Sequence, residues 1–148
     1  MLACGNGGSA SMADHFVGEL VGTFQDRKRR PFPAIALTNA ATLTAIANDF
    51  GYLETFARQV DALGRPGDLL VVLSTSGRSP NVVRAADVAL QRAMYVLVLT
   101  GMAPDPLLAQ ESDRLMCVRC EGTTGTIQQI HLEILHKMCA ELDELEAG

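Results

Sequence analysis

The sequence predicts an α/β fold, with an open, mostly parallel five-stranded sheet covered by helices on both faces. Candidate strands and helices alternate along the chain, which is the order that builds such sheets. Residues 69–73 and 95–99 are continuous apolar runs, which suit strands buried on both faces. With 48% hydrophobic and 20% charged residues, the 148-residue chain has enough apolar material for one core, so we expect a single domain over residues 1–148.

The first part of the chain is predicted to form two strands and a helix. Residues 1–4 are apolar and stop at a glycine, as a strand entering a turn does. Residues 9–23 carry apolar side chains at the three- and four-residue spacing of a helix. The polar run 26–31 ends in proline and is interpreted as a loop with a solvated face. Residues 34–37 are predicted to be the second strand.

The alternation continues to the end of the chain. Asn39 is predicted to cap a helix over residues 40–47, which breaks at Asn48 and Asp49. A second helix over residues 52–63 is expected to end at a glycine. Between and after the two apolar strands, the predicted elements are a helix over 80–93 that begins at proline, a strand over 114–118 and a C-terminal helix over 125–145.

Charge and hydropathy argue against several classes of protein. The net charge of −5 and pI near 5.1 disfavour a nucleic-acid binder that relies on neutralising phosphates. No run reaches 18 apolar residues and no signal-peptide pattern opens the chain, so we expect no membrane span and a cytoplasmic location. The four cysteines are scattered through predicted core segments and are expected to be reduced, buried thiols. They are Cys4, Cys117, Cys120 and Cys139.

Two loops rich in glycine and hydroxyl side chains follow predicted strands and lead into helices. The first is Gly5-Asn6-Gly7-Gly8-Ser9, and the second is Ser74-Thr75-Ser76-Gly77-Arg78-Ser79. Glycine lets the backbone approach a ligand closely, and the free N–H groups and dipole of a helix start favour an anion. Neither loop is a Walker motif. The pair predicts an anion site and does not by itself identify a reaction.

Acid, base and metal-binding side chains recur on two helices. His15 and Glu19 are four residues apart and share one helix face, just beyond the first glycine loop. Gln128 and His136 are two turns apart and about 80° around the axis, close enough to flank one cavity, whereas His131 points elsewhere. Two chemistries suit this set: a carboxylate base with an imidazole acid, or a metal such as zinc held by both histidines, Glu19 and Gln128.

Taken in order, five motifs resemble those of the phosphoheptose isomerase branch of the sugar isomerase (SIS) domain family. They are G-N-G-G-S, H-F-x-x-E-L, A-N-D-F-G, L-S-T-S-G-x-S and I-Q-x-I-H-x-x-x-x-H, and they cover residues 2–142. The resemblance implies a flavodoxin-like SIS fold. It also implies an isomerase that interconverts sedoheptulose 7-phosphate and D-glycero-D-manno-heptose 7-phosphate, the entry step to heptoses for lipopolysaccharide or certain natural products.

The resemblance also assigns residues. Glu19 would be the base that moves a proton between C1 and C2 through an enediol, and His136 its acid partner. Zinc, the expected cofactor, would be held by His15, Glu19, Gln128 and His136. The sugar phosphate would contact Glu19 together with Asn6, Gly7, Gly8, Ser9, Asn48, Asp49, Ser74, Thr75, Ser76, Ser79 and Gln128.

Several departures from the family accompany this resemblance. The family carries an N-terminal helical segment that helps to build a tetramer with sites between subunits, whereas here Met1 opens the first strand. We expect a homo-oligomer, a tetramer or a dimer, with sites at subunit interfaces. Thr23 and Thr126 stand where many members place arginine, and Gln129 replaces glutamate, so substrate affinity or choice is expected to differ.

The alternative function is a non-catalytic SIS protein, either a sugar-phosphate sensor or a regulator like the relatives that bind DnaA. Those DnaA-binding relatives resemble this chain in the loops but lack the glutamate and the last histidine. Because Glu19 and His136 are both present, the sequence favours the enzyme.

Overall fold

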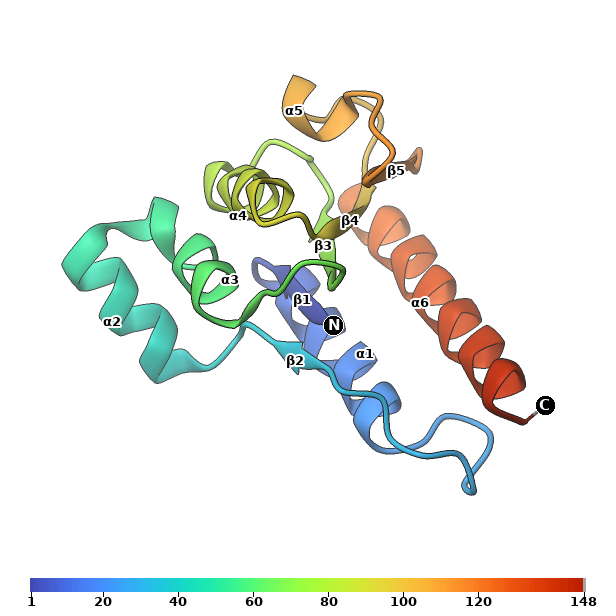
Figure 1. Cartoon of the computed structure of the whole chain (residues 1–148). Coiled ribbons are helices and arrows are strands. Elements are labelled where there is room, and N and C mark those ends of the chain that lie inside the picture. The colour runs from blue at the N-terminus through green and yellow to red at the C-terminus, as the bar shows by residue number, and fades with distance from the viewer. Residues whose placement is uncertain (148) are drawn as a thin grey trace.

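The computed structural model describes residues 1–147, and its centre is a five-stranded parallel sheet with the strand order β2-β1-β3-β4-β5 (Figure 1). This order confirms the predicted open α/β sheet and is the flavodoxin-like arrangement. The strands are β1 (Leu2–Gly5), β2 (Ile35–Ala36), β3 (Leu69–Ser74), β4 (Tyr95–Thr100) and β5 (Leu115–Arg119).

Helices cover both faces of this sheet (Figure 1). They are α1 (Gly8–Val21), α2 (Ala40–Phe50), the 3-10 helix η1 (Tyr52–Glu54), α3 (Ala57–Leu63), α4 (Pro80–Gln91), α5 (Pro106–Ala109) and α6 (Thr124–Ala147). None of these helices is long and apolar enough to cross a membrane.

The core has two parts because successive strand residues point to opposite faces. On one face, Leu70 and Val72 of β3 pack in a cluster with side chains of α3, α4 and α5. On the other face, Val71 and Leu73 pack in a cluster with side chains of α1 and α6. The uninterrupted apolar run of β3 therefore supplies core side chains to both faces of the sheet, as its sequence predicts.

Two predicted elements are wrong in detail, and one observed helix was not predicted. The helix expected to break at Asn48 and Asp49 continues through both to Phe50, because the glycine that stops it is Gly51, whose φ is +87°. The helix expected over residues 52–63 is divided into η1 and α3. The four-residue helix α5 lies in a segment where no helix was expected.

The loop after α1 also differs from its prediction. Most of its cationic side chains are exposed, as expected, but Arg29 is buried with only 1% of its side chain exposed. The predicted loop and its solvated face are therefore confirmed for Arg27, Lys28 and Arg30, and Arg29 is the exception. A single buried cation in a run of exposed ones has no distinct sequence pattern, because only its distant partner explains its burial.

The strand order places the two glycine loops side by side. Gly5 at the end of β1 pairs with Leu73 near the end of β3, so the loops that follow leave the sheet at the same edge. The order of the sheet reverses between these two strands, since β1 connects outward to β2 and β3 to β4. Ligands of open α/β sheets bind in the crevice at this point.

Candidate active site

The helices that follow both loops start without a side-chain cap. Gly7 precedes α1 and Ser79 precedes α4, and neither position provides a side-chain hydrogen bond to the helix. The first turn of each helix also has no acidic residue. Helix starts of this kind leave backbone N–H groups and the positive end of the dipole available to an anion. The prediction of an anion site is consistent with this local geometry.

The hydroxyl groups of the second loop have different environments. Ser74 is buried, and its Oγ accepts a hydrogen bond from the backbone N–H of Gly77 at 3.1 Å. Ser76 is exposed, and its Oγ accepts from the N–H of Arg78 at 3.2 Å. Thr75 and Ser79 are half-buried. Two hydroxyls of the loop therefore stabilise its backbone by hydrogen bonds, and the loop still presents polar atoms at the edge of the sheet.

Asn6 in the first loop belongs to a polar network that the sequence does not indicate. Its side-chain amide exchanges two hydrogen bonds with Asn81 of α4, at 2.9 and 3.0 Å. Its oxygen also accepts from the hydroxyl of Tyr52 at 2.8 Å, and Asn81 donates to Thr55 at 3.2 Å. This network joins the first loop to η1 and to the helix that follows the second loop. Asn81 is 1% exposed, so its role is to fix the two loops relative to each other.

Three of the predicted acid, base and metal-binding side chains converge between α1 and α6. His15 Nε2 lies 3.3 Å from Glu19 Oε1 and 2.9 Å from His136 Nε2. All three ligand atoms lie within 4.8 Å of one another. Zinc ligands at about 2.0–2.2 Å around a tetrahedral ion are separated by roughly 3.3 Å, so this cluster fits such an ion.

Gln128 lies against the start of α1. A Cβ atom on Gly8 would be 2.6 Å from Gln128 Nε2, so the amide fills the space that glycine leaves. Gln128 is eight residues from His136, or about 12 Å along α6. Both side chains contact α1, Gln128 at Gly8 and His136 at His15, so two turns of α6 separate their positions as well as the 80° angle.

Asn48 and Asp49 are the predicted site residues on α2. Both are exposed near the end of α2, where Asn48 Nδ2 donates to Asp49 Oδ1 at 2.8 Å. No described hydrogen bond within residues 1–147 joins either residue to the two loops or to the cluster. Within one chain, the predicted site residues therefore form three groups: the loops with Gln128, the cluster and the end of α2.

His131 and His136 lie in different surroundings, as expected. His131 is fully buried, whereas His136 is half-buried. Within residues 1–147, neither ring nitrogen of His131 has a hydrogen-bond partner, and Thr100 Oγ1 also lacks one. Burial lowers the pKa of the His131 imidazole, and the nearby backbone of Thr100 offsets this only in part. The side chain is therefore neutral in the folded protein near neutral pH.

His131→Leu is expected to weaken the dependence of folding stability on pH below 6.5. Because the folded pKa lies below the usual histidine pKa of 6.5, the unfolded chain takes up the proton first. The wild type therefore has its full stability above 6.5 and loses part of it as the pH falls through the folded pKa. Urea unfolding at several pH values measures this slope in both proteins. Parallel losses in wild type and variant would contradict the prediction.

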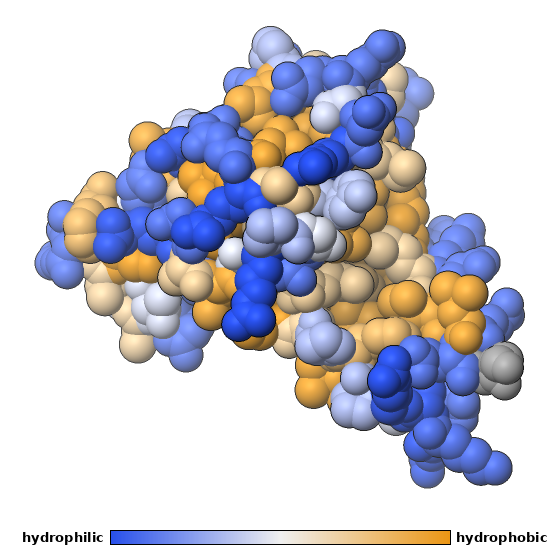
Figure 2. All heavy atoms as spheres, viewed as in Figure 1, coloured by the Kyte–Doolittle hydropathy of each residue, from blue (hydrophilic) through white to orange (hydrophobic). Residues whose placement is uncertain are grey.

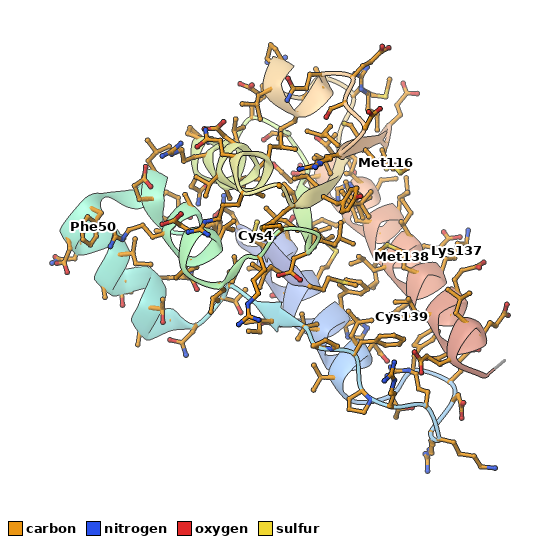
Figure 3. All side chains as sticks on the ribbon, viewed as in Figure 1. Cys4, Phe50, Met116, Lys137, Met138 and Cys139 are labelled. Carbon is orange, nitrogen blue, oxygen red and sulfur yellow. The ribbon has the colours of Figure 1, made fainter. Side chains whose placement is uncertain are left out.

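The cysteines confirm the expected free thiols. All four are free, and Cys4, Cys120 and Cys139 are buried, whereas Cys117 is half-buried. Burial raises the pKa of the Cys4 thiol to about 12 and that of Cys139 to about 11. Figure 3 shows Cys4 in the middle of the molecule and Cys139 on α6. Thiols in such surroundings are unreactive.

Comparison with known proteins agrees with the class that the fold and the site define. The SIS domain model matches residues 1–101. The chain is 50% identical over 151 residues to the phosphoheptose isomerase of Bordetella avium, covering 100% of this chain and 76% of that protein. It is 52% identical over 150 residues to the phosphoheptose isomerase of Streptomyces coelicolor, covering 100% of this chain and 64% of that protein.

A solved structure agrees as well. The phosphoheptose isomerase of Francisella tularensis superposes with a TM-score of 0.90 at 39% sequence identity, covering 97% of this chain and 75% of that one. The chain therefore belongs to the SIS domain family. Within that family, its similarity over the full chain is to the phosphoheptose isomerases.

Proposed function

We propose that the protein is an aldose–ketose isomerase that interconverts sedoheptulose 7-phosphate and D-glycero-D-manno-heptose 7-phosphate. The observation that carries the proposal is the cluster of His15, Glu19 and His136, in a chain about half identical to phosphoheptose isomerases. A carboxylate within 3.3 Å of an imidazole is a suitable pair for moving protons at neutral pH. The product would serve heptose biosynthesis, for example for lipopolysaccharide.

In the proposed mechanism, Glu19 is the base. Its carboxylate removes a proton from C1 of the ketose, which gives an enediol, and the carboxyl group, whose proton exchanges with solvent, then delivers a proton to C2. His136 transfers the hydroxyl proton between the oxygens on C1 and C2. Protons and electrons balance within the substrate, so no oxidant or reductant is required.

The two loops would hold the phosphate end of the substrate. Backbone N–H groups at the starts of α1 and α4 favour the dianion, and the Ser and Thr hydroxyls add donors. The substrate contacts that we propose are Asn6, Gly7, Gly8, Ser9, Glu19, Asn48, Asp49, Ser74, Thr75, Ser76, Ser79 and Gln128.

We also propose a zinc ion at the cluster, with His15, Glu19 and His136 as ligands and Gln128 as the fourth. When bound, such an ion supplies Lewis-acid polarisation of a substrate oxygen. The two imidazoles and one carboxylate are the ligand types that zinc prefers. In the structure the Gln128 amide lies against Gly8, so its participation requires the side chain to turn along α6 toward His136.

The separation between loops and cluster supports a homo-oligomer, a tetramer or a dimer, with sites shared between subunits. Glu19 lies eleven residues beyond Gly8, or about 16 Å along α1 from the first loop. A second chain could bring its own loops to the cluster. Helix α2 has no buried residue, and Phe50 at its outer end is 54% exposed, so this surface is suited to contact with another subunit (Figure 3).

Shared sites predict complementation between two inactive variants. Glu19→Gln removes the base, and Ser76→Asp places a negative charge at an exposed position of the phosphate loop. Each variant alone is expected to lose turnover. Chains co-expressed in equal amounts are expected to recover about a quarter of wild-type turnover, because one site in four combines an intact loop with an intact base. Recovery is measured as kcat of the purified mixture, and sites built within one chain would give none.

The direct test of function is incubation of the purified protein with sedoheptulose 7-phosphate in deuterated water, followed by NMR. Formation of the aldose with deuterium at C2 supports the enediol mechanism. Absence of turnover together with saturable binding of the sugar phosphate would favour a non-catalytic SIS protein instead. Metal content per chain is measured on the same preparation.

A further inference from the structure

The loop that connects α1 to β2 has one buried cation. Arg29 lies in a run of basic residues, and its side chain is 1% exposed, whereas that of the neighbouring Arg30 is 80% exposed. In Figure 2 the tip of this loop, at the lower right, is hydrophilic, as expected for its exposed charges. Burial of a single arginine next to such a surface requires specific partners, because an unpaired buried charge is strongly disfavoured.

Those partners come from the two helices that carry the cluster. The Arg29 guanidinium donates to the backbone oxygens of Glu19 and Leu20, the latter at 2.9 Å, near the carboxyl end of α1. Its Nε donates to the carboxylate of Asp143 on α6. One side chain therefore satisfies carbonyl groups that a helix end leaves free and connects that end to α6.

Asp143 is fully used as an acceptor in the same contact. Its second oxygen accepts from the backbone N–H groups of Gln25 and Asp26, at 2.8 and 2.9 Å. Burial alone would raise the pKa of the Asp143 carboxyl, but these N–H donors and Arg29 outweigh it and lower the pKa. The pair of Arg29 and Asp143, here called the clamp, is thus a buried ion pair whose hydrogen bonds are satisfied.

The same loop also contacts the cluster directly. The Phe24 ring stacks on the His136 imidazole, with 5.4 Å between centroids and 24° between planes. The Arg29 guanidinium lies 4.9 Å from the centroid of Phe32. The clamp therefore fixes the loop at one end while Phe24, in the same loop, orients His136.

We propose that Arg29 is a positioning residue for the cluster. Through Asp143 it holds the end of α1 that carries Glu19 against α6, which carries His136, and it keeps Phe24 stacked on that imidazole. The proposal rests on the proposed isomerase function for its kinetic consequence, although the effect on geometry is independent of any activity. Neither Arg29 nor Asp143 is one of the proposed substrate or metal contacts.

Arg29→Lys is the sharpest test. Lysine keeps the charge next to Asp143, but its single ammonium lacks the planar fork that reaches Asp143 and two carbonyl oxygens together. We expect kcat to fall at least tenfold while KM changes less than threefold, because the phosphate loops are untouched. We also expect the NMR signals of the His15 and His136 imidazoles to move and that of His131 to stay. With three histidines in the chain, each signal is assigned by replacing its residue.

Arg30→Lys is the matched control. Arg30 is the adjacent arginine, is exposed, and pairs with Glu146, which lies on α6 as Asp143 does. It is expected to leave kcat and all three signals unchanged. The proposal is overturned if Arg29→Lys leaves kcat within twofold and the His15 and His136 signals in place. If the wild type has no turnover but the two signals still move, the clamp stands and the proposed function fails. If Arg29→Lys does not fold, Asp143→Asn, which keeps an acceptor oxygen, is measured by the same criteria.

Discussion

Glu19→Gln is expected to lower kcat by about 10²–10⁴-fold with KM changed less than threefold. Glutamine has the shape of glutamate but cannot accept the proton from C1, and loss of a positioned general base has an effect of this size. The Glu19 carboxylate lies 3.3 Å from the His15 imidazole, which is itself 2.9 Å from His136. Both imidazoles are already in contact with each other, so neither can simply replace the missing base.

The measurement is steady-state turnover of sedoheptulose 7-phosphate. Glu133→Gln is the matched control, because Glu133 on α6 is exposed and, within residues 1–147, forms an ion pair only with Lys137 at 2.8 Å. The kcat of this variant should equal that of the wild type. Zinc per chain is measured on the same samples, because the change also removes a charged ligand. Loss of turnover with zinc retained assigns the effect to the base. A variant with near-normal kcat would eliminate Glu19 as the base.

Gly77→Ala is expected to raise KM for the sugar phosphate at least tenfold and to destabilise the fold by at least about 2 kcal/mol. Gly77 has a φ of +63°, a conformation that costs an L-residue roughly 1–2 kcal/mol. A Cβ atom there would lie 2.3 Å from Thr100 Oγ1 and 2.8 Å from Pro104 Cα, so the loop would have to move. That movement breaks the hydrogen bond from Gly77 to Ser74 and displaces the proposed phosphate donors.

Gly18→Ala provides the comparison for this substitution. Gly18 lies inside α1, where an added Cβ atom meets nothing within 4 Å. Alanine there is expected to stabilise the helix by about 0.5–1 kcal/mol and to leave KM unchanged. Urea unfolding and steady-state kinetics measure both effects. If Gly77→Ala kept KM within twofold of the wild-type value, the second loop would not be the site that holds the phosphate.

Local patterns in the sequence predicted most of the fold. The apolar runs of β3 and β4 are buried strands, and α1 and α6 agree with the predicted helices to within about two residues at most ends. One error concerns the residue at which a helix ends. Asn48 and Asp49 are weak helix breakers, whereas Gly51 at positive φ ends the helix. Between η1 and α3 lies Phe56, which is 2% exposed and packs in the core.

The candidate site was also predicted only in part, because some of its contacts are local in the sequence and others are not. Residues four apart on one helix must share a face, so the pairing of His15 with Glu19 follows from helical geometry alone. The contact of His15 with His136 spans 121 positions, and only the packing of α1 against α6 creates it. Asn81 and Tyr52, which bind Asn6, have no motif that distinguishes them from ordinary surface residues.

The sequence alone was enough to predict the class of fold, the two loops rich in glycine and hydroxyl groups, and which side chains are candidates for acid, base and metal-ligand roles, because these depend on local periodicity, turn chemistry and side-chain chemistry. The tertiary structure decided which of those residues meet. It joined His15, Glu19 and His136, placed Gln128 against Gly8, and buried Arg29 in the clamp with Asp143, 114 residues away. Such contacts depend on how helices lie across the sheet, and the free energy that selects this arrangement comes from burial of the whole core rather than from any local pattern.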